Sequence, residues 1–262
     1  MSNIPVTKMT ESDYRSLPAL NASRFKAFHR SPYHFFNQKE VETTEAMKIG
    51  TAVHTAMLEP SLYESSIGYL PDVDGRTTEG KAIKKAFEEK YAGKTILKAA
   101  SEEIVDRACI AIQYSHEWKA IKTVQNMRYE QVLLCDLHGV PCKSKLDLID
   151  VENGIIRDIK TCDDASIDKF SYTIKDRLYW LQAGFYCLMA EKVYNKPFNF
   201  EFIAAETCDP STALFHPVDE KELSHWKQLV DILLLEYTDC LKADHWPKAK
   251  NKVISGLNIR LR

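Results

Sequence analysis

The sequence predicts an α/β fold in which a central β-sheet is flanked by helices. Strand-like runs of branched and aromatic residues follow one another in the middle of the chain, and helical patterns lie on both sides of them. The expected strands are 127–137, 140–150, 155–161, 199–207 and 212–217. The expected helices of this half are 166–175, 178–194 and 219–241. A meander followed by helices, another strand pair and a long helix is compatible with one layered unit.

The first half of the chain is expected to be mostly helical. Ser23 is expected to cap a helix that ends near Arg30, and Pro32 suits the first turn of the next helix. Apolar spacing and turn residues predict three further helices and one loop. The helices are 45–58, 78–91 and 101–117, and the loop is 69–76.

Composition is that of an intracellular globular protein. The chain has 262 residues, 45% of them hydrophobic and 27% charged, which fits one large domain with a substantial core. No apolar run approaches the length of a membrane span, and no secretory signal begins the chain, so we expect a cytoplasmic protein without a membrane partner. Seven cysteines without a Cys-x-x-Cys pair indicate reduced thiols and argue against structural zinc.

The most informative stretch is 145–160, where two strand-like runs flank a Glu-Asn-Gly turn signal. Folded back as a hairpin, it brings Asp147 opposite Asp158 or Lys160, depending on the turn. In either register the three side chains share one face, because strand side chains alternate. Two carboxylates and an ammonium among Ile, Leu and Val are costly to desolvate, and a bound Mg²⁺ would offset that cost. The hairpin indicates a metal-dependent phosphodiesterase site in which Lys160 orients water or stabilises charge on the phosphate.

Three features elsewhere add to this hypothesis. Glu130 lies on the strand before the hairpin, and His54 is a single imidazole in the apolar helix that begins before Gly50. Gln182 and Tyr186 are one helical turn apart and therefore share a helix face. Each has a plainer explanation, since a lone histidine or a polar helix face is more often structural. The pattern Asp-x10-Asp-x-Lys alone also occurs by chance in solvated hairpins.

Taken in order along the chain, these motifs resemble the RecB-like branch of the PD-(D/E)XK nuclease superfamily. The segments Asn21–Lys26, Ser31–Tyr33 and Gly50–Pro60 further resemble the nuclease domain of RecE (exodeoxyribonuclease VIII) and its phage relatives. The resemblance runs from about residue 10 to Pro247, which is nearly the whole chain. The second acidic position is Asp158 where many superfamily members carry Glu, and RecE-like proteins share this Asp.

The resemblance implies a restriction-endonuclease-like fold with a central mixed sheet. It implies a single nuclease domain over 1–262, with a helical part at about 10–120 and a catalytic core at about 125–242. It assigns metal ligands, catalytic groups and DNA-facing helix residues. The implied metal ligands are His54, Asp147, Asp158 and the backbone carbonyl of Ile159. The implied catalytic residues are Asp147, Asp158 and Lys160. Gln182 and Tyr186 would face DNA, and Glu130 is a further acidic candidate. Arg24, Lys26 and Arg30 are candidate contacts to DNA phosphate.

The activity implied is that of a Mg²⁺-dependent exonuclease, with Mn²⁺ as a substitute ion. It would degrade linear double-stranded DNA from its ends in the 5′ to 3′ direction and leave 3′ single strands for a phage-type annealing protein. A closed ring of three or four subunits is expected, in a bacterial or phage-infected cell. Because the net charge is −2, each subunit would contribute a modest basic lining to a shared channel.

Two other classes of protein are compatible with parts of the sequence. A non-catalytic DNA-binding or annealing module would not need Asp147, Asp158 and Lys160. A nuclease of CRISPR-adaptation type would need clustered cysteines for an iron–sulfur cluster near the C-terminus, where Cys208 and Cys240 stand apart. A restriction-type endonuclease would share the fold, but the N-terminal motifs favour an enzyme that processes ends.

Overall fold

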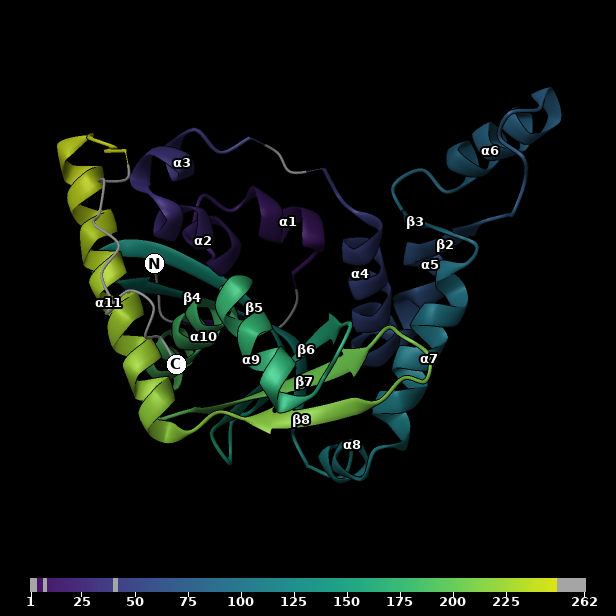
Figure 1. The fold of residues 1–262 in the computed structure, drawn as a ribbon. Coiled ribbons are helices and arrows are strands. Elements are labelled where there is room, and N and C mark those ends of the chain that lie inside the picture. The colour runs from purple at the N-terminus through teal and green to yellow at the C-terminus, as the bar shows by residue number, and fades with distance from the viewer. Residues whose placement is uncertain (1–3, 7–8, 40–41, 249–262) are drawn as a thin grey trace.

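The computed structural model describes residues 4–6, 9–39 and 42–248. Its centre is a six-stranded sheet in the order β1-β4-β5-β6-β7-β8 (Figure 1). Strands β6 and β7 are parallel, and the other neighbours are antiparallel, so the sheet is mixed. The strands are β1 (Ile4–Val6), β4 (Arg128–Leu137), β5 (Val140–Asp150), β6 (Ile155–Cys162), β7 (Asn199–Glu206) and β8 (Ala213–Pro217). The predicted fold class is confirmed.

Helices cover both faces of this sheet. One hydrophobic cluster joins the sheet to α2, α9, α10 and α11, and a second joins it to α4, α7 and α8. The first group is α2 (Ala22–Arg30), α9 (Ile167–Asp176), α10 (Tyr179–Tyr194) and α11 (Glu220–Ala243). The second group is α4 (Glu45–Leu58), α7 (Ser101–Tyr114) and α8 (His116–Ile121). The site described below lies where α4 and α10 approach the same part of β5 and β6.

The hairpin of β5 and β6 has a four-residue connection, 151–154, and not the two-residue turn that the sequence suggested. Gly154 has a φ of +67°, and a Cβ there would lie 2.8 Å from the carbonyl oxygen of Pro197, so both conformation and space favour glycine. Leu148 pairs with Arg157. Continuing this register by one residue places Asp147 opposite Asp158 and settles the alternative that the sequence left open.

Several local predictions hold. The helix expected at 45–58 is α4, and Thr44 caps it by accepting a hydrogen bond from the backbone N–H of Met47 at 3.3 Å. Ser31 caps α3 (Pro32–Phe36), where Pro32 occupies the first turn as expected. Asp219 caps α11 in the same way, through the backbone N–H groups of Lys221 and Glu222.

Other predictions require correction. Asn21, not Ser23, caps α2, because its side chain accepts from the backbone N–H of Arg24. The helix expected at 101–117 is broken at Ser115, whose extended backbone and side-chain oxygen cap α8 at Trp118. The segment 69–76 is expected to be a loop, but its first two residues belong to strand β2 (Ile67–Leu70).

The first half of the chain therefore contains unpredicted strands as well as helices. Strand β2 (Ile67–Leu70) pairs in parallel with β3 (Thr95–Lys98), and β1 joins the central sheet. Between β2 and β3 the chain forms α6 (Thr78–Lys90), which projects from the rest of the molecule in Figure 1. The remaining short helices are α1 (Glu11–Ser16), η1 (Pro60–Leu62) and α5 (Tyr63–Ser66). Among the helices described, none is both long and apolar enough to cross a membrane.

Candidate metal centre

Three acidic residues occupy one row across three adjacent strands. Tyr129 pairs with Leu148 and Gln131 with Leu146, which leaves Glu130 opposite Asp147. The register of the hairpin likewise leaves Asp158 opposite Asp147 on the other side. Neither Glu130–Asp147 nor Asp147–Asp158 is among the paired residues of the ladder. The regular pairing of the strands is therefore interrupted along this acidic row.

Backbone geometry contributes to this interruption. Glu130 has a φ of +50° in the middle of β4, a left-handed conformation that is uncommon for a residue other than glycine. Such strained positions persist where the surroundings hold them, and they concentrate at functional sites. On the other side of the row, the backbone N–H of Ile159 donates to Oδ2 of Asp147 at 2.8 Å, so a carboxylate takes the bond that a strand partner would accept.

The imidazole of His54 reaches this row from α4. A Cβ on Gly50, one turn earlier, would lie 3.4 Å from Oγ1 of Thr161 on β6, so the helix lies close to the sheet. His54 Nδ1 lies 3.3 Å from Oδ2 of Asp147, and Nε2 lies 2.8 Å from the carbonyl oxygen of Ile159. A histidine that donates one ring N–H to a backbone carbonyl has its other nitrogen oriented for a cation, which is the usual arrangement around metal-binding histidines.

The donor set fits a divalent cation. Ligand atoms of His54, Glu130 and Asp147 all lie within 4.8 Å of one another. Two carboxylates and an imidazole, with Asp158 adjacent, supply mostly oxygen donors, which suit Mg²⁺ or Mn²⁺. Without a cation the like charges oppose one another. Burial, followed by the charge of Asp147, raises the pKa of Glu130 to about 7.

Asp158 and Lys160 form the second half of the centre. They make a close ion pair in which the Asp158 side chain is 1% exposed and that of Lys160 is 12% exposed. Burial and the neighbouring Asp147 carboxylate raise the pKa of Asp158, whereas Lys160 opposes the rise. The carboxylates in turn outweigh burial and raise the pKa of Lys160, so its ammonium stays charged. A cation at this row would favour the ionised form of Asp158.

Helix α10 contacts the other oxygen of the Asp158 carboxylate, Oδ1, whereas Lys160 pairs with Oδ2. Nε2 of Gln182 donates to Oδ1 of Asp158 at 2.9 Å, and Nζ of Lys26 donates to Oε1 of Gln182 at 3.2 Å. The ammonium groups of Lys26 and Lys160 each lie 4.9 Å from the centre of the Tyr179 ring. Burial and then the charge of Lys160 lower the pKa of Lys26 to about 7. The amide orientation of Gln182 is thus fixed by groups on both of its sides.

The structure brings most of the predicted site residues together. Glu130, His54, Asp147, Asp158, Lys160 and the carbonyl of Ile159 meet at the row, with Gln182 and Lys26 beside it. Tyr186 lies one turn beyond Gln182, and burial and the charge of Asp158 raise the pKa of its phenol well above the ordinary value. Arg24 and Arg30 are exposed on α2; the Arg24 guanidinium lies 4.9 Å from the ring centre of Phe35, and no contact joins these two arginines to the row.

Two lysines have contacts that sequence reasoning missed. The sequence suggests Lys26 only as a contact to DNA phosphate, yet the structure shows that it donates to Gln182 inside the centre. Lys145 forms a close ion pair with Glu130, a role that the sequence motifs do not assign to it. A signal for Lys145 was present, because alternation on β5 places it on the same face as Asp147, two residues later.

A mixed sheet with this acidic row, a lysine two residues after Asp158 and an imidazole from a neighbouring helix defines a PDDEXK-like protein. Residues 21–254 match a PDDEXK-like domain of unknown function (DUF3799), and the chain belongs to that family.

Comparison with solved structures agrees on the fold. A crystal structure of a "putative exonuclease" from Eubacterium rectale has a TM-score of 0.64 and 15% identity, and the match covers 98% of this chain and 99% of that one. At this identity the likeness shows the fold alone. A crystal structure of SSO0001 has a TM-score of 0.28 and 13% identity, and the match covers 87% of this chain and 98% of that one. This score is too low to show a shared fold. No curated protein matches the sequence.

Replacing His54 with alanine is expected to weaken metal binding and to reduce its pH dependence. Burial disfavours the imidazolium, but the Asp147 carboxylate outweighs it and raises the pKa of His54 above its usual value. The ring therefore carries a proton at pH 6 that a bound cation must displace, so wild-type affinity should increase from pH 6 to pH 8. Losing one ligand worth 1.4 kcal/mol or more raises the dissociation constant about tenfold or more.

Calorimetric titration of Mn²⁺ into both proteins at pH 6 and pH 8 measures this effect. Mn²⁺ should also restore more cleavage activity than Mg²⁺, because it binds nitrogen and oxygen ligands more tightly. An unchanged titration curve in His54→Ala would assign the imidazole a packing role.

Proposed function

We propose that this protein is a Mg²⁺-dependent exodeoxyribonuclease that degrades linear double-stranded DNA from its ends. The observation that carries the proposal is the buried row of Asp147 and Asp158 with Lys160 beside it, in a chain of a PDDEXK-like family. The resemblance to RecE-like nucleases supports a 5′ to 3′ direction and a product with 3′ single strands for recombination by an annealing protein.

The residues of the centre would have different roles in phosphodiester hydrolysis. When bound by His54, Asp147 and Asp158, the cation would supply activation of water and neutralisation of charge on the scissile phosphate. The Lys160 ammonium, held by Asp158, would orient the attacking water and stabilise the charge that develops on the phosphate oxygens. Gln182 would keep the Asp158 carboxylate in place, since it donates to Oδ1 at 2.9 Å.

The remaining expectations form part of the same proposal. One nuclease domain would span 1–262, with its catalytic core at about 125–242, and would act in the cytoplasm. Three or four copies would close into a ring around the duplex, so that a chain with a net charge of −2 holds DNA through a shared basic channel. Light scattering at micromolar concentration tests the ring: a monomer mass would remove it and leave the nuclease proposal standing.

A cleavage assay on matched DNA substrates tests the function. We expect the protein with Mg²⁺ to degrade linear duplex DNA, to leave closed-circular duplex of the same sequence intact, and to lose activity in EDTA. Cutting of the closed circle would indicate a restriction-type endonuclease. DNA binding without cleavage of either substrate would indicate an annealing or binding module and would contradict the proposal.

A further inference from the structure

A second lysine, Lys145, lies beside the acidic row on β5. Residues 143, 145 and 147 alternate with the intervening residues along the strand, so Lys143, Lys145 and Asp147 project from one face. The two lysines have different partners: Lys143 contacts backbone carbonyls, whereas Lys145 contacts carboxylates. Of these two lysines, Lys145 is therefore the one that affects the charge of the metal centre directly.

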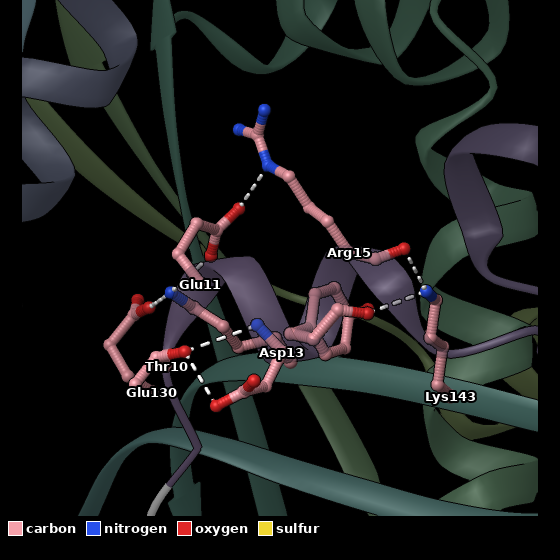
Figure 2. A network of polar contacts seen from close by, with 8 residues as sticks. Thr10, Glu11, Asp13, Arg15, Glu130 and Lys143 are labelled. Carbon is pink, nitrogen blue, oxygen red and sulfur yellow. Dashed lines mark hydrogen bonds and ion pairs between the residues drawn. The ribbon is translucent and has the colours of Figure 1, made fainter. Parts of the chain in front are cut away.

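The ammonium of Lys145 connects two carboxylates. It forms a close ion pair with Oε2 of Glu130 and lies 3.4 Å from Oε2 of Glu11 on α1. Glu11 also accepts from Nε of Arg15 at 2.8 Å. Figure 2 shows this network from Arg15 and Glu11 on α1 to Glu130 on β4.

The position of Glu11 is fixed because α1 is itself attached to β5. Nζ of Lys143, a residue that is 4% exposed, donates to the carbonyl oxygens of Tyr14, Arg15 and Leu17 at 2.6, 3.3 and 2.8 Å. These carbonyls belong to the last turn of α1 and the residue after it, where backbone oxygens lack helical partners. Lys145 is thus held between a fixed helix and the acidic row.

We propose that the Lys145 ammonium takes the place of a second divalent cation, so that the centre binds a single metal ion. This inference rests on the proposed function. In two-metal phosphodiesterases the ions lie about 3.5–4 Å apart and share carboxylate ligands. Ligand atoms of His54, Glu130 and Asp147 lie within 4.8 Å of one another, close enough for one ion. If the first ion is instead held by His54, Asp147 and Asp158, Glu130 is the carboxylate of the row that remains on the other side of Asp147 for a second ion. Lys145 already occupies one oxygen of Glu130, and its positive charge repels a divalent ion there.

The proposal therefore places one metal ion and two ammonium groups around the acidic row. One metal ion would lie between His54, Asp147 and Asp158, while the two ammonium groups of Lys145 and Lys160 flank it through Glu130 and Asp158. Removal of the Lys145 ammonium would leave Oε2 of Glu130 without its ion-pair partner and available to a metal ion.

The stoichiometry of Mn²⁺ binding to the intact protein without DNA tests this inference. By calorimetry and electron paramagnetic resonance, the wild type should bind one Mn²⁺ per chain with the signal of an isolated ion. Lys145→Met should bind two, and the ions should show spin coupling because they lie close together. Lys145→Arg keeps the charge and should remain at one, and Lys145→Met combined with Glu130→Gln should return to one.

Two results would overturn the inference without touching the proposed function. They are two ions per chain in the wild type, or one ion per chain in a Lys145→Met protein whose circular dichroism and melting are those of a folded chain. The wild-type measurement decides even if the variant fails to fold. A wild-type protein that binds no Mn²⁺ would remove the metal centre and with it both proposals.

Discussion

Asp147→Asn is expected to abolish DNA cleavage while leaving the fold intact. Asp147 lies at the centre of the acidic row, 3.3 Å from His54 Nδ1 and 2.8 Å from the backbone N–H of Ile159. His54, Lys160 and that N–H outweigh burial and lower the pKa of Asp147, so it is the carboxylate best suited to stay ionised. Its loss should remove several kcal/mol of transition-state stabilisation, or about three orders of magnitude in rate.

Asp150→Asn is the matched control for this variant. Asp150 is 2% exposed on the same strand, and its oxygens accept from the backbone and side-chain nitrogens of Asn153 at 3.0 and 2.7 Å. Its hydrogen bonds support the hairpin connection, three residues beyond Asp147 along the strand. Cleavage rates on linear duplex, together with thermal melting, should show near-wild-type activity for Asp150→Asn and none for Asp147→Asn. Comparable activity in two folded variants would contradict the assigned role of Asp147.

Elements with strong local signals were predictable from the sequence. The hairpin strands and α4 have alternating or helical apolar spacing and clear end signals, and they lie within one or two residues of the expected bounds. Because both acidic residues belong to this hairpin, the core of the candidate site followed from one local segment. The register depended on the length of the turn, which composition alone did not determine.

Elements that depend on distant contacts were missed. Strands β2 and β3 have four residues each, and their parallel pairing joins segments separated by the whole of α6, so neither shows enough alternation to be recognised. The left-handed conformation of Glu130 was equally hidden, since glutamate carries no preference for it. The contact of Lys26 with Gln182 joins residues 156 positions apart. Tertiary packing, and not local preference, creates all three features.

Lys160→Met is expected to lower the rate of DNA cleavage without weakening metal binding. Lys160 binds no cation itself, so the affinity for Mn²⁺ should be kept or increased when a neighbouring positive charge is lost. The rate on linear duplex should fall about 10²–10³-fold, because the ammonium that stabilises developing phosphate charge is removed. Asp158 remains bound to Gln182 in this variant, which limits the effect on folding.

Lys26→Met, compared with Lys160→Met at a pH below 7, distinguishes the position of a positive charge from its mere presence. The lower pH is needed because the pKa of Lys26 is about 7, so that its amine is protonated there. Lys26 and Lys160 are both 4.9 Å from the Tyr179 ring centre, but Lys26 donates to Gln182 whereas Lys160 pairs with Asp158 directly. If Lys160 acts on the reacting phosphate, its loss should cost far more rate than the loss of Lys26, with Mn²⁺ affinity maintained in both variants. Single-turnover cleavage rates and Mn²⁺ titrations supply the comparison. Equal losses would mean that the two lysines serve only the local electrostatic potential, and that Lys160 has no specific role at the reacting phosphate.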